Sequence, residues 1–109
     1  MRPTIGVIAP HAGYVYSGRT AAMVFARVTV PPPGLVIILA PNHTGVCGVE
    51  SGVSLWEAGA FRTPLGEVPI DTEAAQTMRE ISKGLIEVDH DAHRGEHAIE
   101  VELPFLQLL

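Results

Sequence analysis

Two short apolar runs, residues 4–9 (TIGVIA) and 35–40 (LVIILA), stand out because no polar positions alternate with the apolar ones. Such runs are typical of strands buried on both faces of a parallel sheet. Between them, residues 18–28 follow a candidate N-cap, Ser17, and carry apolar residues at helical spacing. This stripe consists of Ala21, Val24, Phe25 and Val28. Strand, helix and strand in this order predict a βαβ unit with parallel strands and a right-handed crossover.

The pattern changes in the second half of the chain. Residues 52–70 are punctuated by glycine and proline, which predicts a hairpin or an excursion from the sheet. Asp71 is a candidate N-cap for a helix over residues 72–83 that ends at Gly84. Its expected buried stripe consists of Ala74, Met78 and Ile81.

The last third begins with LIEV, residues 85–88, which predicts a short strand, and continues into a polar, histidine-rich loop. Residues 98–109 fit two patterns, which we compare by the spacing of their apolar positions. Helical spacing is met by Ile99, Leu103 and Leu106, and strand alternation by Val101, Leu103 and Phe105. We favour the helix. The fold class expected is α/β, mainly a parallel sheet flanked by helices.

Composition narrows the picture further. The 109 residues fit one domain, with 47% apolar and 17% charged residues, against a usual charged fraction of roughly 25%. A net charge of −5 without a Lys/Arg cluster argues against a nucleic-acid partner. No apolar run approaches the roughly 20 residues of a membrane span, so no membrane is expected. The single cysteine, Cys47, excludes an internal disulfide, is expected to be a small buried hydrophobe, and fits a cytoplasmic location.

The chain stops on an apolar run, ELPFLQLL, without a polar tail. This favours a fragment cut within its core. Either another chain covers the run, for example through self-association, or it leaves an exposed apolar patch. The residues concerned are Leu103, Phe105, Leu106, Leu108 and Leu109.

Two histidines, His11 and His43, follow the two expected parallel strands, each after an Ala-Pro pair. Parallel strands of one unit end at the same edge of a sheet, where open α/β sheets bind ligands. Imidazole is a common ligand for iron, copper and zinc. The pair therefore predicts a shared metal ion, and the alternative is that each ring only bonds a nearby carbonyl. Tyr14 and Tyr16 either line this pocket or pack at its base.

A second group of histidines lies in DHDAHRGEH, residues 89–97, among several acidic residues. For His90 the alternatives are a solvated acidic loop or a functional site. His97 precedes the final apolar run and is a candidate catalytic acid or base beside a metal, or a group that supports a metal ligand.

Four ordered blocks resemble the Memo family, also called AmmeMemoRadiSam system protein B. They are APHAGYVYSG, APNHTG, FRTPLGEVPID and AHRGEHAIEVELPFLQ, spread over nearly the whole chain. The resemblance implies an incomplete fold related to class III extradiol dioxygenases and a mononuclear non-haem site for iron(II) or copper. It assigns His11 and His43 as metal ligands and His97 as the histidine near the metal, with Ala98 where the family commonly has serine.

The resemblance covers residues 1–109 as the N-terminal portion of a single Memo-like domain. Family members are more than twice as long, and the part with the third ligand, a cysteine, is absent here. Weak metal binding is therefore expected. The implied function is redox or dioxygenase-like, acting on an unknown small molecule or peptide. The alternatives are a non-enzymatic peptide- or protein-binding module that meets radical SAM and AMMECR-type proteins, or a structural remnant without a function of its own.

Overall fold

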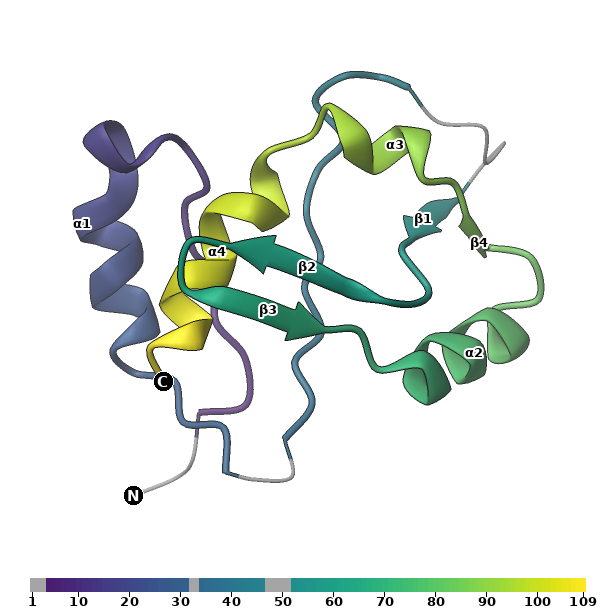
Figure 1. Cartoon of the computed structure of the whole chain (residues 1–109), viewed down its shortest axis with the longest axis horizontal. Helices are drawn as coiled ribbons and strands as arrows, with labels where there is room; N and C mark the ends of the chain where they lie inside the picture. The colour runs from purple at the N-terminus through teal and green to yellow at the C-terminus, as the bar shows by residue number, and fades with distance from the viewer. Residues whose placement is uncertain (1–3, 32–33, 47–51) are drawn as a thin grey trace. The chain divides into compact units, whose positions relative to one another are not determined.

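The computed structural model describes residues 4–31, 34–46 and 52–109. The chain divides into two compact units, each described here by itself (Figure 1). Unit 1 consists of Met1–Ala40 and His97–Leu109, and unit 2 is the continuous segment Pro41–Glu96. Unit 1 is therefore built from both ends of the chain.

Unit 1 is organised around helix α1 (Tyr14–Phe25), which packs against helix α4 (Ala98–Gln107). The rings of Phe25 and Phe105 stack with centroids 5.3 Å apart and planes only 4° from parallel. Ala21 and Phe25 of the expected apolar stripe are buried and Val24 is half-buried, whereas Val28 lies beyond the helix, which ends at Phe25 rather than at residue 28. Helical structure at 98–107 likewise confirms the favoured of the two patterns for the final run.

Helix α1 begins earlier than the sequence pattern indicated, at Tyr14 rather than at residue 18. Its N-cap is Gly13, whose backbone carbonyl accepts from the N–H groups of Tyr16 and Ser17. Ser17 is thus inside the first turn, and its hydroxyl donates to the carbonyl of Ala12 at 3.3 Å. The N-cap prediction for Ser17 is wrong because the glycine supplies the helix start one turn earlier.

The predicted strands at 4–9 and 35–40 are not formed, and this expectation is wrong. Neither segment forms a strand, and no backbone hydrogen bond joins the two segments among the described residues. Both are exposed rather than buried, with Ile5 at 100% and Leu39 at 84% of full side-chain exposure. Strands buried on both faces need ladder partners and a covering layer on each side. The described part of unit 1 offers two helices and no further strand, so these requirements are not met.

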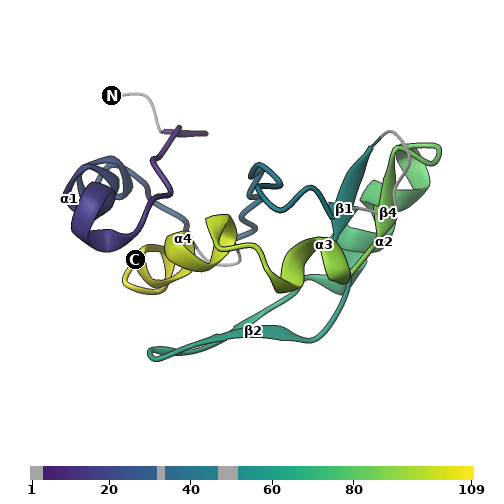
Figure 2. The ribbon, with the colours of Figure 1, turned by 90° about the horizontal axis from the view of Figure 1, so that it is seen from above.

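Both two-stranded sheets of the described residues belong to unit 2 (Figure 2). Strand β1 (Val53–Leu55) pairs in parallel with β4 (Ile86–Val88), with Ser54 opposite Glu87. Strands β2 (Ala60–Thr63) and β3 (Gly66–Pro69) form an antiparallel hairpin, which confirms the hairpin expected from the glycine and proline pattern. The observed class is α/β, with a small parallel sheet and a separate antiparallel pair.

Helix α2 (Thr72–Ile81) lies against β4 and is capped as expected. The Asp71 carboxylate accepts from the N–H of Ala74 at 2.9 Å. The expected stripe is wrong for Ile81, which is 72% exposed, because the buried face centres on Ala75. At about 100° per residue, Ile81 lies roughly 120° around the axis from Ala75. Lys83 and Gly84, with φ of 53° and 90°, then turn the chain back towards β4.

The final apolar run is divided in its exposure. Leu103 is buried, Phe105 and Leu106 are half-buried within unit 1, and Leu108 and Leu109 are exposed. The expected patch is therefore limited to Leu108 and Leu109, and coverage of the run by another chain stays a prediction. Among the described residues no helix is both long and apolar enough to cross a membrane.

Candidate functional site

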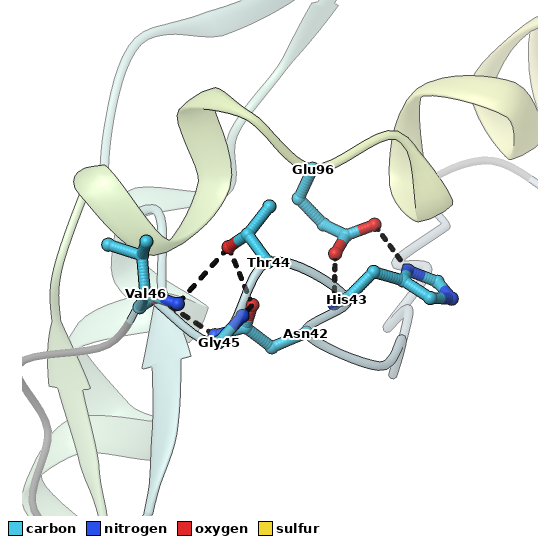
Figure 3. A network of polar contacts seen from close by, with 6 residues as sticks. All are labelled: Asn42, His43, Thr44, Gly45, Val46 and Glu96. Carbon is cyan, nitrogen blue, oxygen red and sulfur yellow. Dashed lines mark hydrogen bonds and ion pairs between the residues drawn. The ribbon is translucent and has the colours of Figure 1, made fainter.

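The first candidate histidine, His43, stands on a short loop that is held together by the side chain of Asn42 (Figure 3). The Asn42 Oδ1 accepts from the Thr44 hydroxyl at 3.0 Å and from the Gly45 N–H at 3.1 Å, while its Nδ2 donates to the Val46 carbonyl at 2.9 Å. Gly45 has a φ of 74°, a conformation that favours glycine. The APNHTG block therefore encodes a loop whose own side chains fix the place of His43.

Glu96 binds His43 through both of its carboxylate oxygens (Figure 3). Its Oε1 accepts from the backbone N–H of His43, and its Oε2 lies 2.7 Å from the ring Nδ1. The Glu96 side chain is only 8% exposed, whereas that of His43 is 42% exposed. The arrangement is a shielded carboxylate that anchors a more accessible imidazole. Sequence reasoning placed Glu96 only among nearby acidic residues.

His43 and Glu96 offer an imidazole nitrogen and a carboxylate oxygen, both donor types that divalent metals accept, and His97 follows Glu96 directly in the chain. A histidine whose second ring nitrogen is held by a carboxylate is the usual form of a metal-ligating histidine. The chemistry of this pair therefore fits a metal ion.

The other two candidate histidines, His11 and His97, lie together in unit 1. Their ring centroids are 6.3 Å apart, with planes at 40° to each other. His97 is the N-cap residue of α4, and His11 is half-buried. The structure thus brings the expected acid–base residue close to one expected metal ligand. That His11 and His43 share one ion stays a prediction, because the two rings belong to different units.

The tyrosines expected near the pocket differ in their surroundings. Tyr14 packs edge-on against Phe105, with centroids 6.0 Å apart, and partial burial together with the carboxylates of Glu100 and Glu102 raises its pKa. Tyr16 is strongly exposed. Whether either lines a metal pocket stays a prediction. Cys47, expected as a buried hydrophobe, lies outside the described residues.

A second histidine group in unit 2 surrounds Trp56, which the sequence pattern did not single out. The two histidines of this group are His90, the N-cap residue of helix α3 (Asp91–Arg94), and His93 within that helix. The Trp56 ring stacks on His90 and meets His93 edge-on. The His90 Nε2 is 2.6 Å from Glu57 Oε2, so the solvated-loop alternative is wrong for His90.

His93 is tied to the parallel strand pair. Its Nε2 lies 3.0 Å from the Ser54 hydroxyl, which itself donates to the Asp89 carbonyl at 2.7 Å. Burial lowers the pKa of His93, and the His90 hydrogen bond lowers the pKa of Glu57. These contacts join α3 to β1, so we assign this group a structural role in unit 2.

Comparison with known proteins places the chain in a family. Residues 1–109 match the family described as "Memo-like protein". A MEMO1 family protein of Methanothermobacter thermautotrophicus is 50% identical over 108 residues, covering 98% of this chain and 38% of that protein. A MEMO1 family protein of Aeropyrum pernix is 48% identical over 106 residues, covering 96% and 36% respectively.

The chain therefore belongs to the Memo-like family, as the four sequence blocks indicated. It spans little more than a third of the length of the curated relatives it matches. No solved structure matches it.

Proposed function

We propose that this chain supplies two histidine ligands, His11 and His43, of a mononuclear non-haem metal site for iron(II) or copper. The observation that carries the proposal is the contact between His43 Nδ1 and the Glu96 carboxylate at 2.7 Å. This is the second contact that metal-ligating histidines usually make, and it is made here by a shielded carboxylate.

In this proposal His97 is the group that takes up or gives a proton beside the metal. Its ring lies 6.3 Å from that of His11, so a substrate held at His11 would be within reach of it. Imidazoles titrate near neutral pH and serve as acid or base there. A redox-active ion would supply electron transfer when bound, which gives the site an oxidoreductase or dioxygenase-like role. An incomplete fold related to the extradiol dioxygenases belongs to the same proposal.

Two imidazoles alone make an incomplete site. Non-haem iron sites commonly add an anionic ligand to two histidines, and the third family ligand, a cysteine, is absent from this chain. We therefore expect weak binding of iron(II) or copper(II) by these residues alone, and binding that decreases as the pH falls, because histidine ligands must be deprotonated.

Calorimetric titration with iron(II) and copper(II) tests this proposal. The variants are His11→Ala, His43→Ala and the double substitution, with exposed Gln76→Ala in α2 as the matched control. Each single histidine substitution should weaken binding by at least tenfold, and the control should leave it unchanged. Equal binding by the wild-type chain and the double variant would rule out the site.

A second candidate function is a non-enzymatic peptide- or protein-binding module of the AmmeMemoRadiSam system. The observation in its favour is the exposure of large apolar side chains in unit 1, including Ile5, Ile8 and Leu39. Apolar patches of this kind mark interaction surfaces. Pull-down with purified radical SAM and AMMECR-type proteins tests it, with Ile8→Glu and Leu39→Glu as variants. Loss of capture in both variants supports the module, and capture that is absent in the wild type contradicts it.

A further inference from the structure

We propose that Glu96 is a positioning residue that selects which nitrogen of His43 is presented to the metal. This inference rests on the proposed function, and it assigns Nδ1 to the carboxylate and Nε2 to the metal. It concerns the orientation and tautomer of one ligand, which the sequence pattern does not assign.

The chemistry of the contact fixes the tautomer. An ionised carboxylate only accepts hydrogen bonds, so in the 2.7 Å contact with Glu96 Oε2 the hydrogen belongs to His43 Nδ1. A neutral imidazole carries one hydrogen, and its lone pair is then on Nε2. Because the two nitrogens diverge from the ring, Nε2 points away from Glu96 (Figure 3). Metal ligation requires that lone pair.

The backbone contact makes the assignment specific. The same carboxylate accepts from the His43 backbone N–H through Oε1. Backbone and ring of one residue are therefore bound to one rigid group, which restricts both the position of the loop and the rotation of the ring. The carboxylate is shielded, and hydrogen bonds strengthen where water is excluded.

The loop adds a second restraint that does not involve Glu96. The side chain of Asn42 binds Thr44, Gly45 and Val46, the three residues that follow His43. Removal of Glu96 should therefore release mainly the ring of His43, while the loop keeps its shape. This separation makes the positioning role testable.

The variants are Glu96→Gln, which keeps one acceptor oxygen, and Glu96→Ala, which keeps none. The control is Glu80→Gln on α2, where an exposed carboxylate accepts from Gln76 within the same unit. The first readout is the nitrogen chemical shifts of the His43 ring in the metal-free protein near pH 8.5, about two units above the free imidazole pKa. His43→Gln assigns the signals by their loss.

We expect the Nδ1–H tautomer in the wild type and the control, and the Nε2–H form, favoured in water, in Glu96→Ala. The second readout is copper(II) affinity together with the paramagnetic resonance spectrum. Loss of a carboxylate behind a ligating histidine should weaken binding 10–100-fold. Glu96→Gln should be intermediate, and the ligand set in the spectrum should stay the same in all variants.

An Nε2–H tautomer in the wild type, or one tautomer shared by wild type and Glu96→Ala, would overturn the inference while leaving the metal function intact. A changed ligand set in the copper spectrum of Glu96→Gln would overturn it too, because Glu96 would then be a direct ligand. A wild-type chain with the Nδ1–H tautomer that binds no ion would contradict the proposed function instead, and with it any positioning role.

Discussion

The indole of Trp56 lies on the imidazole of His90, with ring centroids 3.9 Å apart and planes at 21°. The Glu57 carboxylate binds the same imidazole at 2.6 Å. The His90 ring therefore connects the segment that follows β1 to the start of α3. The stacked pair is the packing centre of this end of unit 2, where no large side chain is fully buried among the described residues.

Replacement of Trp56 by alanine should destabilise unit 2. A buried Trp→Ala substitution costs about 3–5 kcal/mol, and half-burial reduces this to roughly 2 kcal/mol. Trp56→Phe keeps a ring against His90 and should cost less than half as much. Urea unfolding followed by circular dichroism measures both, since Trp56 is the sole tryptophan and its fluorescence is lost with it. Equal stability of Trp56→Ala and the wild type would contradict the packing role.

His93 should make the free energy of unfolding depend on pH just below neutrality. Burial lowers its folded pKa below 6.5, so between the two values the unfolded chain binds more protons. Stability therefore rises with pH in that window and is lost as pH falls from about 6.5 towards the folded pKa. His93→Gln should flatten this part of the profile, measured as wild type minus variant by urea unfolding from pH 5 to 8. A difference that does not change with pH would refute the assignment.

Glu102 should make the free energy of unfolding depend on pH in the opposite direction. It is 7% exposed, its Oε2 has no hydrogen-bond partner, and burial raises its pKa above 4.5. The folded state then binds more protons, so its contribution decreases as pH rises from 4.5 through the folded pKa. Glu102→Gln should stabilise the protein at pH 7, on the order of 1 kcal/mol, by removing an unpartnered buried charge. Glu100→Gln, at an exposed position of the same helix, is the control.

A spectroscopic readout separates this charge effect from repacking. The carboxylates of Glu100 and Glu102 both raise the pKa of Tyr14. In Glu102→Gln the ultraviolet titration of Tyr14 should therefore move to lower pH, with Tyr14→Phe used to subtract the signal of Tyr16. An unchanged titration would mean that Glu102 does not act on Tyr14 through its charge.

The cap of α2 offers a local test. The Asp71 carboxylate accepts from the N–H of Ala74, and Asp71→Ala should cost about 1 kcal/mol. Asp71→Asn keeps an acceptor at the same place and should retain most of the stability. Thermal unfolding compares the two, and equal melting temperatures for Asp71→Ala and the wild type would contradict the cap.

The sequence predicted those features that depend on neighbours along the chain. The Asp71 cap, the hairpin of β2 and β3, and the helical form of α4 follow from local spacing and turn chemistry, and all three were confirmed. The prediction of strands at 4–9 and 35–40 was wrong because a strand needs hydrogen-bonding partners far away in the sequence, which an apolar run does not reveal.

The candidate site likewise has residues that the sequence indicates and contacts that only the structure shows. His43 was recognisable from its block, but its partner Glu96 lies 53 positions away, and only folding shows that contact. Trp56 was overlooked because a lone aromatic residue in a hairpin-like stretch has no periodicity. Its histidine partners were visible, but their common neighbour was not.

The two-part origin of unit 1 has a consequence for biosynthesis. Helix α1 is made before unit 2, yet the ring that stacks on its Phe25 belongs to α4 and is made only after all of unit 2. Unit 2 is continuous, so β1 and β4 can pair before α4 has been made and can pack against α1. Domains fold as their segments become available during synthesis. The apolar face of α1 therefore stays without its α4 partner on the nascent chain until all of unit 2 has been made.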